Sequence, residues 1–375
     1  MQKKLIAIAV AGALGAPALA LAQASTVQIY GKATFEYSYV DQGPGRPDTD
    51  ILQTPGGASV GFKGTEALGG GLSAWFQCES SADIRGVGQD GFCSRNSALG
   101  FKGGFGNVYV GRWDTPFKRS MVGSTTGGED TGVFGTAFLL AGSSTGTIGG
   151  GARHIWKRRQ SSMIVYEAPS MGGLNIGIGY SAGAATGATN ATTAAEPRVQ
   201  SLAATYQNGP LAIGAGYERH SEFGSAGGAN DDTGLSLSAT YNFGKVTLGG
   251  AYNEQRYDVS TTTNSKKKAY HLGIAVNVSG PHNIEAGYTV ADDISGTAGA
   301  AAINGATVPA VGNNTGAKLY QISYVHKFSK RTSGRFGYVK LDNDSAASYN
   351  LGGAGTVTAA GQSQSAVAAY LSHNF

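Results

Sequence analysis

The residues best suited to nucleophilic chemistry are the serines in three matches to the pattern Gly-x-Ser-x-Gly. Many hydrolases carry their nucleophilic serine in this pattern, on a turn between a strand and a helix. The matches lie at residues 57–61, 142–146 and 179–183. A chain with 60 glycines is expected to contain roughly one such match by chance, and none of the three opens a helix that is followed by an acid and a histidine. The pattern therefore does not predict an enzyme.

Histidines and cysteines could bind a metal if their spacing were suitable. The two cysteines, Cys78 and Cys93, are too far apart in sequence for a Cys-x-x-Cys pair. The six histidines lie at positions 154, 220, 271, 282, 326 and 373, without the spacing of a ligand pair. There is no phosphate-binding loop either, so the sequence predicts no metal site and no cofactor.

Charged residues occur in the longest stretch without a strand pattern, which runs from Asp114 to Arg158. Glu129 and Asp130 lie near its middle, and the basic run of residues 157–159 follows at its end. A structureless loop of this length is uncommon in a compact domain and is usually functional or disordered. If the remaining chain closes into a barrel, we expect this loop to fold into the lumen and narrow it.

The remaining chain has the period-two pattern of half-buried β-strands. In the stretch 27–39, Val27, Ile29 and Phe35 alternate with polar residues such as Lys32. Alternation of this length places one face of a strand in an apolar medium and the other in water. The pattern returns near residues 72–76, 108–110, 174–180, 211–217, 235–243, 246–252, 270–278, 284–290 and 320–324.

The residues on the second face of these strands distinguish a membrane barrel from a soluble β-sandwich. A sandwich buries large apolar side chains between two sheets, whereas these strands carry small or polar residues there, such as Ser236 and Ser238. Seven short turns alternate with eight long loops, and these fifteen connections join sixteen strands. The predicted fold is all-β: a transmembrane antiparallel β-barrel of 16 strands, with the long third loop folded into the lumen.

Both chain ends are expected on the short-turn side, where the last strand, residues 363–375, pairs with the first. Closure leaves no unpaired backbone edge in the hydrocarbon. By alternation Lys32 and Lys63 face the lumen, and so does Arg159, because it lies an odd number of residues from the outward Ile164. Each of these charges could also be a solvated lining residue without a role in selectivity.

The N-terminus has the organisation of a secretory signal peptide over residues 1–22. Two lysines precede an apolar stretch, and the Ala-rich end allows cleavage after Ala22 or after Ala24. A membrane-spanning helix needs about 20 apolar residues, and Pro17 interrupts this segment. We therefore expect export, with the barrel formed by residues 23–375.

Several longer stretches match one known family in combination. They are Tyr30-Gly31, GFKGTEALGGGLSAWFQ at 61–77, GFKGGFGNVYVGR at 100–112, YEAPSMGGL at 166–174 and the terminal His373-Asn374-Phe375. With these residues the whole mature chain resembles the Gram-negative general porins of the trimeric neisserial and Burkholderia type.

The resemblance implies a homotrimer of sixteen-stranded barrels whose last residue, here Phe375, is read by the barrel-assembly machinery. In this family basic residues on the wall face acids on the inward third loop, so that solutes cross a transverse field. The matching basic positions are Arg95 in strand four and Arg159 in strand six, and the loop acids are Glu129 and Asp130.

Two departures from the family pattern affect the expected selectivity. A further wall arginine of the family falls near Ser59, and the loop lacks a Pro-Glu-Phe-Gly-Gly turn. Any anion preference is therefore expected to be weak, and Glu129 and Asp130 could instead lie on the outer surface. The predicted constriction comprises Arg95, Arg159, Lys63, Lys32, Glu129 and Asp130.

Cys78 and Cys93 flank the second long loop at the ends of adjacent strands. An oxidising compartment permits a bridge, and partners on adjacent strands can approach within disulfide distance. We expect a disulfide in preference to two free thiols. In the family this loop contacts a neighbouring subunit.

These observations predict a general diffusion porin of the Gram-negative outer membrane, which passes ions and small hydrophilic solutes. Expected partners are two further copies, membrane lipid, lipopolysaccharide and the assembly machinery. Removing the two N-terminal lysines lowers the net charge from +4 to +2, too small to indicate a nucleic-acid partner. The alternatives are a substrate-specific channel and a plugged structural or adhesive barrel.

Overall fold

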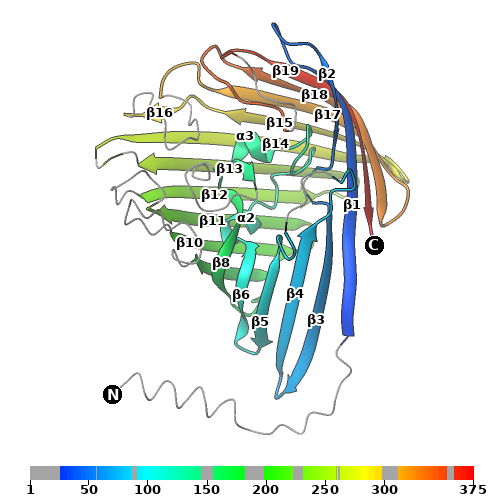
Figure 1. Cartoon of the computed structure of the whole chain (residues 1–375), viewed down its shortest axis with the longest axis vertical. Coiled ribbons are helices and arrows are strands. Elements are labelled where there is room, and N and C mark those ends of the chain that lie inside the picture. The colour runs from blue at the N-terminus through cyan, green and yellow to red at the C-terminus, as the bar shows by residue number, and fades with distance from the viewer. Residues whose placement is uncertain are drawn as a thin grey trace.

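The chain forms a closed antiparallel barrel in the computed structural model, which describes residues 26–55, 57–86, 91–144, 155–181, 198–222, 231–258, 260, 262–297, 311–352 and 359–375 (Figure 1). Each wall strand pairs with the next one along the chain, and the ring closes where the last strand pairs with the first, with Phe35 opposite Leu371. The predicted signal peptide lies outside the described residues.

Sixteen of the strands in these residues form the wall, which confirms the predicted fold class. Their bounds are β1 (Thr26–Asp41), β3 (Ser59–Gly69), β4 (Leu72–Ser81), β5 (Ser97–Gly103), β6 (Gly106–Asp114), β8 (Lys157–Glu167), β9 (Leu174–Ser181), β10 (Arg198–Asn208), β11 (Leu211–Ser221), β12 (Asp231–Asn242), β13 (Val246–Asp258), β14 (Asn264–Ser279), β15 (His282–Ala291), β17 (Ala317–Lys327), β18 (Thr332–Asn343) and β19 (Gln364–Asn374).

Three short strands lie in segments that the sequence assigned to loops. β2 (Thr49–Gln53) folds back on β1, β7 (Ser143–Ser144) pairs in parallel with β8, and β16 (Ser295–Gly296) pairs with β14. β7 and β16 have two residues each, too few for alternation to reveal them. β2 does not alternate, because its apolar residues Ile51 and Leu52 are adjacent. None of the helices within the described ranges is long and apolar enough to cross a bilayer.

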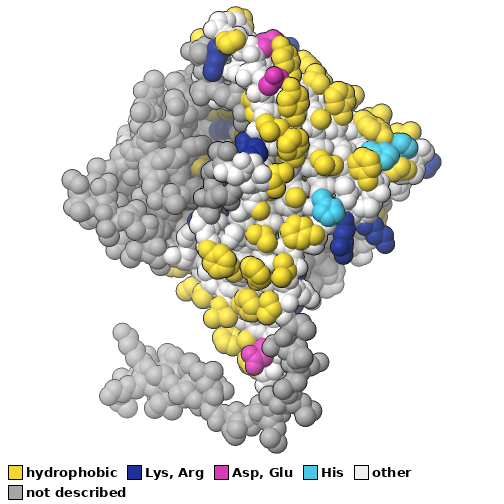
Figure 2. Space-filling model, turned by 45° about the vertical axis from the view of Figure 1, so that its right-hand side comes forward, with side chains coloured by type: hydrophobic (Ala, Val, Ile, Leu, Met, Phe, Trp, Pro, Cys, Tyr) yellow, Lys and Arg dark blue, Asp and Glu magenta, His cyan; other side chains and the backbone are white. Residues whose placement is uncertain are grey.

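The two faces of the wall differ as the alternation predicts. On β12, Leu235 and Leu237 remain 40% and 47% exposed, whereas Ser236 and Ser238 are buried on the opposite face. Figure 2 shows hydrophobic side chains spread over the outside of the wall. An outer surface of this kind suits a hydrocarbon environment, and the polar inner face suits water.

The sequence predicts no regular structure in the long third loop. The structure differs, because two one-turn helices form within it. They are α2 (Pro116–Arg119) and α3 (Ala137–Leu140). Thr115 caps α2 by accepting a hydrogen bond from Lys118 N at 3.2 Å, and Pro116 occupies the first turn, where its missing N–H costs nothing. We refer to residues 115–142 as the long-loop segment; residues 145–154 lie outside the described ranges.

The long-loop segment packs against the polar face of the wall rather than against its apolar outside. Phe134 and Leu139 are fully buried in one apolar cluster with Leu319 of β17 and Leu341 of β18. Glycine on the wall permits part of this contact, because a side chain at Gly214 would collide with the Ser120 carbonyl oxygen. The segment is thus held by both apolar packing and close backbone approach.

Candidate functional site

Arg159 is nearly buried in β8, the sixth wall strand. The strand register shifts between Met163 and Gln160, so alternation counted from Ile164 does not decide the face on which Arg159 lies. Its Nε donates to Oδ1 of Asn96 at 2.6 Å and lies 3.3 Å from a carboxylate oxygen of Asp114. Asp114 in turn accepts a hydrogen bond from Lys118 Nζ at 2.7 Å. Arg159 therefore ties the wall to the beginning of the long-loop segment.

Arg95 lies in the same region but two residues before β5, in the connection rather than within the wall strand. Its Nε is 2.7 Å from Oε1 of Glu79 on β4. The other oxygen of Glu79 accepts from the Tyr30 hydroxyl at 3.1 Å, and Lys63 Nζ lies 5.0 Å from the centre of the Tyr30 ring. The structure thus links Arg95 to Lys63 through Glu79 and Tyr30, whereas Arg159 contacts Asn96, the residue that follows Arg95 in the sequence.

Asp130 joins this group from the long-loop segment. One of its carboxylate oxygens lies 2.6 Å from Lys157 Nζ, which also donates to the Ser124 hydroxyl at 3.1 Å. Burial acts to raise the pKa of Asp130, but Lys157 and then Lys118 lower it more, so the net pKa falls below its usual value. The Asp130 side chain is 42% exposed as a whole, but Oδ1, the oxygen that pairs with Lys157, is buried.

Glu129 does not face Arg95 and Arg159, although the sequence grouped it with Asp130. Its carboxylate lies 3.0 Å from Arg335 Nη2 of β18, which is also 2.8 Å from Glu285 of β15. The sequence prediction missed Arg335. Alternation could have found it, because Arg335 precedes the outward residue Phe336.

Two further charged residues of the wall are Glu36 and Lys32, both on β1. Glu36 of β1, which the sequence prediction also missed, accepts hydrogen bonds from Val133 N at 3.1 Å and from Gln53 Nε2 at 2.5 Å. Lys32 lies apart, beside the first loop, with its Nζ 3.6 Å from the position of a Cβ on Gly57. The structure therefore anchors the long-loop segment on both sides of the barrel, but it does not gather all six predicted residues in one place.

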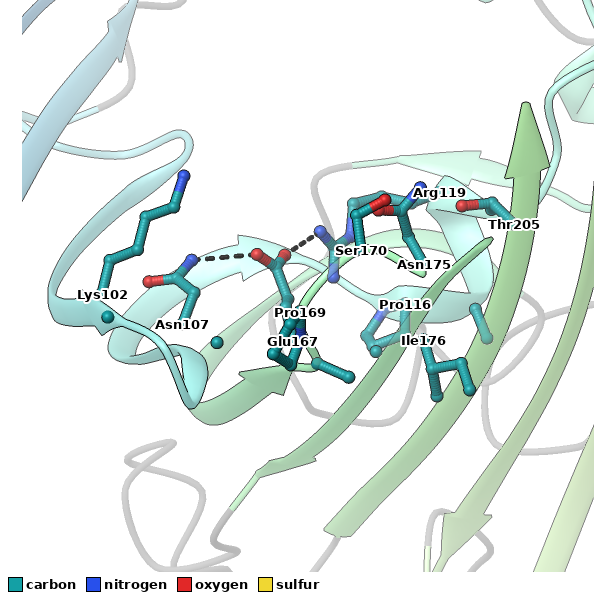
Figure 3. Close-up of a pocket in the computed structure, with 15 residues that line it drawn as sticks. Lys102, Asn107, Pro116, Arg119, Glu167, Pro169, Ser170, Asn175, Ile176 and Thr205 are labelled. Atoms are coloured by element: carbon teal, nitrogen blue, oxygen red, sulfur yellow. Dashed lines mark hydrogen bonds and ion pairs between the residues drawn. The ribbon is translucent and has the colours of Figure 1, made fainter. Parts of the chain in front are cut away.

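A cavity of about 650 Å³ opens at the short-turn end, below α2 (Figure 3). Glu167 of β8 lies at its centre, where it is ion-paired with Arg119 and accepts from Asn107 Nδ2 at 2.9 Å. Lys102 points into the same cavity from the opposite side. Two neighbouring residues of α2 therefore pair with acids at different sites. Lys118 pairs with Asp114 beside Arg159, and Arg119 pairs with Glu167 in the cavity.

A disulfide joins Cys78 and Cys93, whose Cα atoms are 4.8 Å apart. The structure agrees with the prediction of a bridge across the second long loop. Across the described ranges, no three His, Cys, Asp or Glu side chains are grouped so that they could hold a metal ion. Several charged groups of the interior are instead paired with one another, as Arg335 is with Glu129 and Glu285.

The family comparison gives a consistent result over most of the chain. A family model described as Gram-negative porin matches residues 7–346. The chain is 30% identical to outer membrane porin protein 32 of Delftia acidovorans, with all of both chains covered. It is 27% identical to an outer membrane porin protein of Bordetella pertussis, over 89% of this chain and 92% of that one.

A solved structure also resembles the fold. The anion-selective porin from Comamonas acidovorans superposes with a TM-score of 0.74 at 26% identity, covering 94% of this chain and all of that chain.

Proposed function

The chain belongs to the Gram-negative porin family and is an outer-membrane general diffusion channel; on this premise we propose which residues set its width and its field. The long-loop segment lies within the lumen and forms one side of the narrowest part. The other side is the wall that carries Arg95 and Lys63, and Arg159 lies where this wall meets the segment. Ions and small hydrophilic solutes pass between them.

The proposal rests on two ion pairs, which hold the two acids of the long-loop segment. Asp130 is bound to Lys157 and Glu129 to Arg335, so the segment is fixed against the inner face at two separate points. A segment fixed in this way narrows the channel permanently. It also keeps its carboxylates at a constant distance from the wall cations.

The net field favours anions weakly. The proposed set contains four cations, namely Arg95, Arg159, Lys63 and Lys32, and two acids, Glu129 and Asp130. Two of the cations are partly offset, because Arg95 is paired with Glu79 and Arg159 with Asp114. Lys63 is exposed and forms no such ion pair with the residues that the structure describes, so we infer that its charge contributes more to the field in the channel than the charge of Arg95 or Arg159. The anion selectivity of the Comamonas acidovorans relative supports the same sign.

Export and assembly follow the family resemblance. Residues 1–22 are removed as a signal peptide after Ala22 or Ala24, and residues 23–375 form the barrel. Phe375 serves as the signal that the barrel-assembly machinery reads. Three copies associate as a homotrimer, and the outer loops lie among lipopolysaccharide.

Planar-bilayer recording of the purified protein tests the proposal directly. We expect stepwise conductance increases, closure in groups of three, and a reversal potential of anionic sign under a salt gradient. A cationic sign would contradict the assigned field while leaving the pore intact. Folded protein without conductance would instead support a plugged barrel, and a conductance blocked by one solute class at low concentration would support a substrate-specific channel.

A further inference from the structure

The outer surface at the short-turn end carries imidazole and basic side chains that take no part in the pore. His282 of β15 and His326 of β17 are directly opposite each other in the strand register. Both continue the outward rows of Ile284 and Tyr324, which are 45% and 40% exposed. Figure 2 shows His side chains together with Lys and Arg side chains at the right-hand edge of the hydrophobic surface.

One tyrosine hydroxyl holds both imidazoles. The Tyr324 hydroxyl lies 2.6 Å from Nδ1 of His282 and 2.9 Å from Nδ1 of His326. A hydroxyl has a single hydrogen, so with neutral rings it donates to one Nδ1 and accepts from the other. The ring whose Nδ1 accepts carries its own hydrogen on Nε2, and this N–H is available to an external acceptor.

Permanent cations lie in the turn next to this pair. Lys330 and Arg331 occupy the exposed connection between β17 and β18. Neither side chain forms an ion pair with any residue in the described part of the chain. Phe328 packs against His326 with ring centres 4.5 Å apart, which continues the apolar surface up to the charged turn.

The ligand suited to these groups is an anion with an apolar attachment. Two adjacent imidazoles could bind a divalent cation, but Lys330 and Arg331 repel one. A free anion would satisfy the charges but would leave the adjoining surface of Phe328 and Ile284 unused. A phospholipid satisfies both, because its phosphate lies at the level of the turn while its acyl chains cover the apolar wall.

We propose that His282, His326, Lys330 and Arg331, here called the rim patch, bind the phosphate of an anionic phospholipid in the periplasmic leaflet of the outer membrane. The inference rests on the outer-membrane location and not on the proposed constriction. Conductance measurements can therefore fail while lipid binding succeeds, and the reverse.

Native mass spectrometry of the folded protein in detergent tests this proposal, with phosphatidylglycerol and phosphatidylcholine titrated separately. The unaltered protein should bind phosphatidylglycerol at a several-fold lower lipid concentration. The double variant Lys330→Gln and Arg331→Gln should weaken phosphatidylglycerol binding by about fivefold or more and leave phosphatidylcholine binding unchanged. His282→Gln combined with His326→Gln should weaken it by a smaller factor, since the two Gln side chains retain hydrogen-bond donors.

Lys245→Gln is the matched control, because Lys245 is an exposed basic residue in another short turn that has no imidazole pair in its strand register. It should bind phosphatidylglycerol like the unaltered protein. The proposal would be overturned if Lys245→Gln weakened phosphatidylglycerol binding as much as the double variant does. Equal affinity of the unaltered protein for the two lipids would also overturn it. Displacement of phosphatidylglycerol by millimolar inorganic phosphate would also overturn it in favour of a free-anion site. Heat-modifiable gel migration establishes that every variant is folded.

Discussion

The ring of Phe375, the last residue, packs on Gly31 in the first strand. The backbones of the two residues also exchange hydrogen bonds, from Phe375 N to Gly31 O at 3.0 Å and from Gly31 N to Phe375 O at 3.1 Å. A Cβ on Gly31 would collide with the Phe375 ring and would lie 2.6 Å from the Ser59 carbonyl oxygen. The seam that closes the barrel therefore depends on a glycine and an aromatic residue at opposite ends of the chain.

Gly31→Ala should impair closure, because the added methyl group meets backbone as well as the ring, and overpacking of this kind costs about 1–3 kcal/mol. The heat-modifiable fraction after refolding should fall. Gly104→Ala is the control, since a Cβ at Gly104 has open space around it. Equal refolding of both variants would contradict the proposed role of the seam.

Removing the disulfide should destabilise the loop but not the pore. Cys78 and Cys93 are 15 residues apart, and a cross-link over such a loop stabilises by about 3 kcal/mol in the chain-entropy description. Replacing both with serine should lower the thermal midpoint of the folded protein and leave single-channel conductance unchanged. A change in single-channel conductance would mean that this loop shapes the lumen.

Arg159→Ala and Arg95→Ala should each move the reversal potential toward the cationic sign. The change should exceed that of the control Arg219→Ala, because Arg219 continues an outward row of β11 and pairs with Asp231. The Arg95 variant should show the larger shift, since Arg95 is the ion-pair partner of Glu79, whereas Asp114 keeps Lys118 when Arg159 is removed. If all three variants keep the original potential, the wall cluster does not set selectivity.

Asp130→Asn should increase the anion preference, because it removes a partly exposed carboxylate and frees the charge of Lys157. Glu129→Gln should have a smaller effect on selectivity, since Arg335 keeps Glu285 as a partner. Reversal potentials measured in the same salt gradient compare the two variants. A larger shift in Glu129→Gln would reverse their assigned importance.

The contribution of Asp130 should persist into mildly acidic solution. Its folded-state pKa is lowered, so the stabilisation from its ion pairs is present above its unfolded pKa and is lost only as the pH falls through the folded value. The difference in reversal potential between the unaltered protein and Asp130→Asn should therefore stay constant from about pH 7 to about pH 5, above the usual Asp pKa of roughly 3.9. A difference that disappears within this interval would mean that Asp130 is not held by Lys157 and Lys118.

The sequence alone determined the wall, because each strand must separate water from hydrocarbon, and that requirement repeats every second residue. The alternation around Leu235 and Ser236, the alternating loop lengths and the terminal aromatic residue all follow from this local rule. The rule does not extend to Arg159, because the register of β8 shifts between Met163 and Gln160. Arg335 follows the same rule, because it precedes the outward Phe336.

Only the tertiary structure decided which charges meet. The long-loop segment has no periodic constraint, so its course depends on packing of Phe134 and Leu139 against wall residues that lie about 200 positions further along the chain. That course carries Glu129 to Arg335 and Asp130 to Lys157, although the two acids are adjacent in sequence. Coulomb interactions fall with distance in space, so sequence neighbours could not reveal these partners.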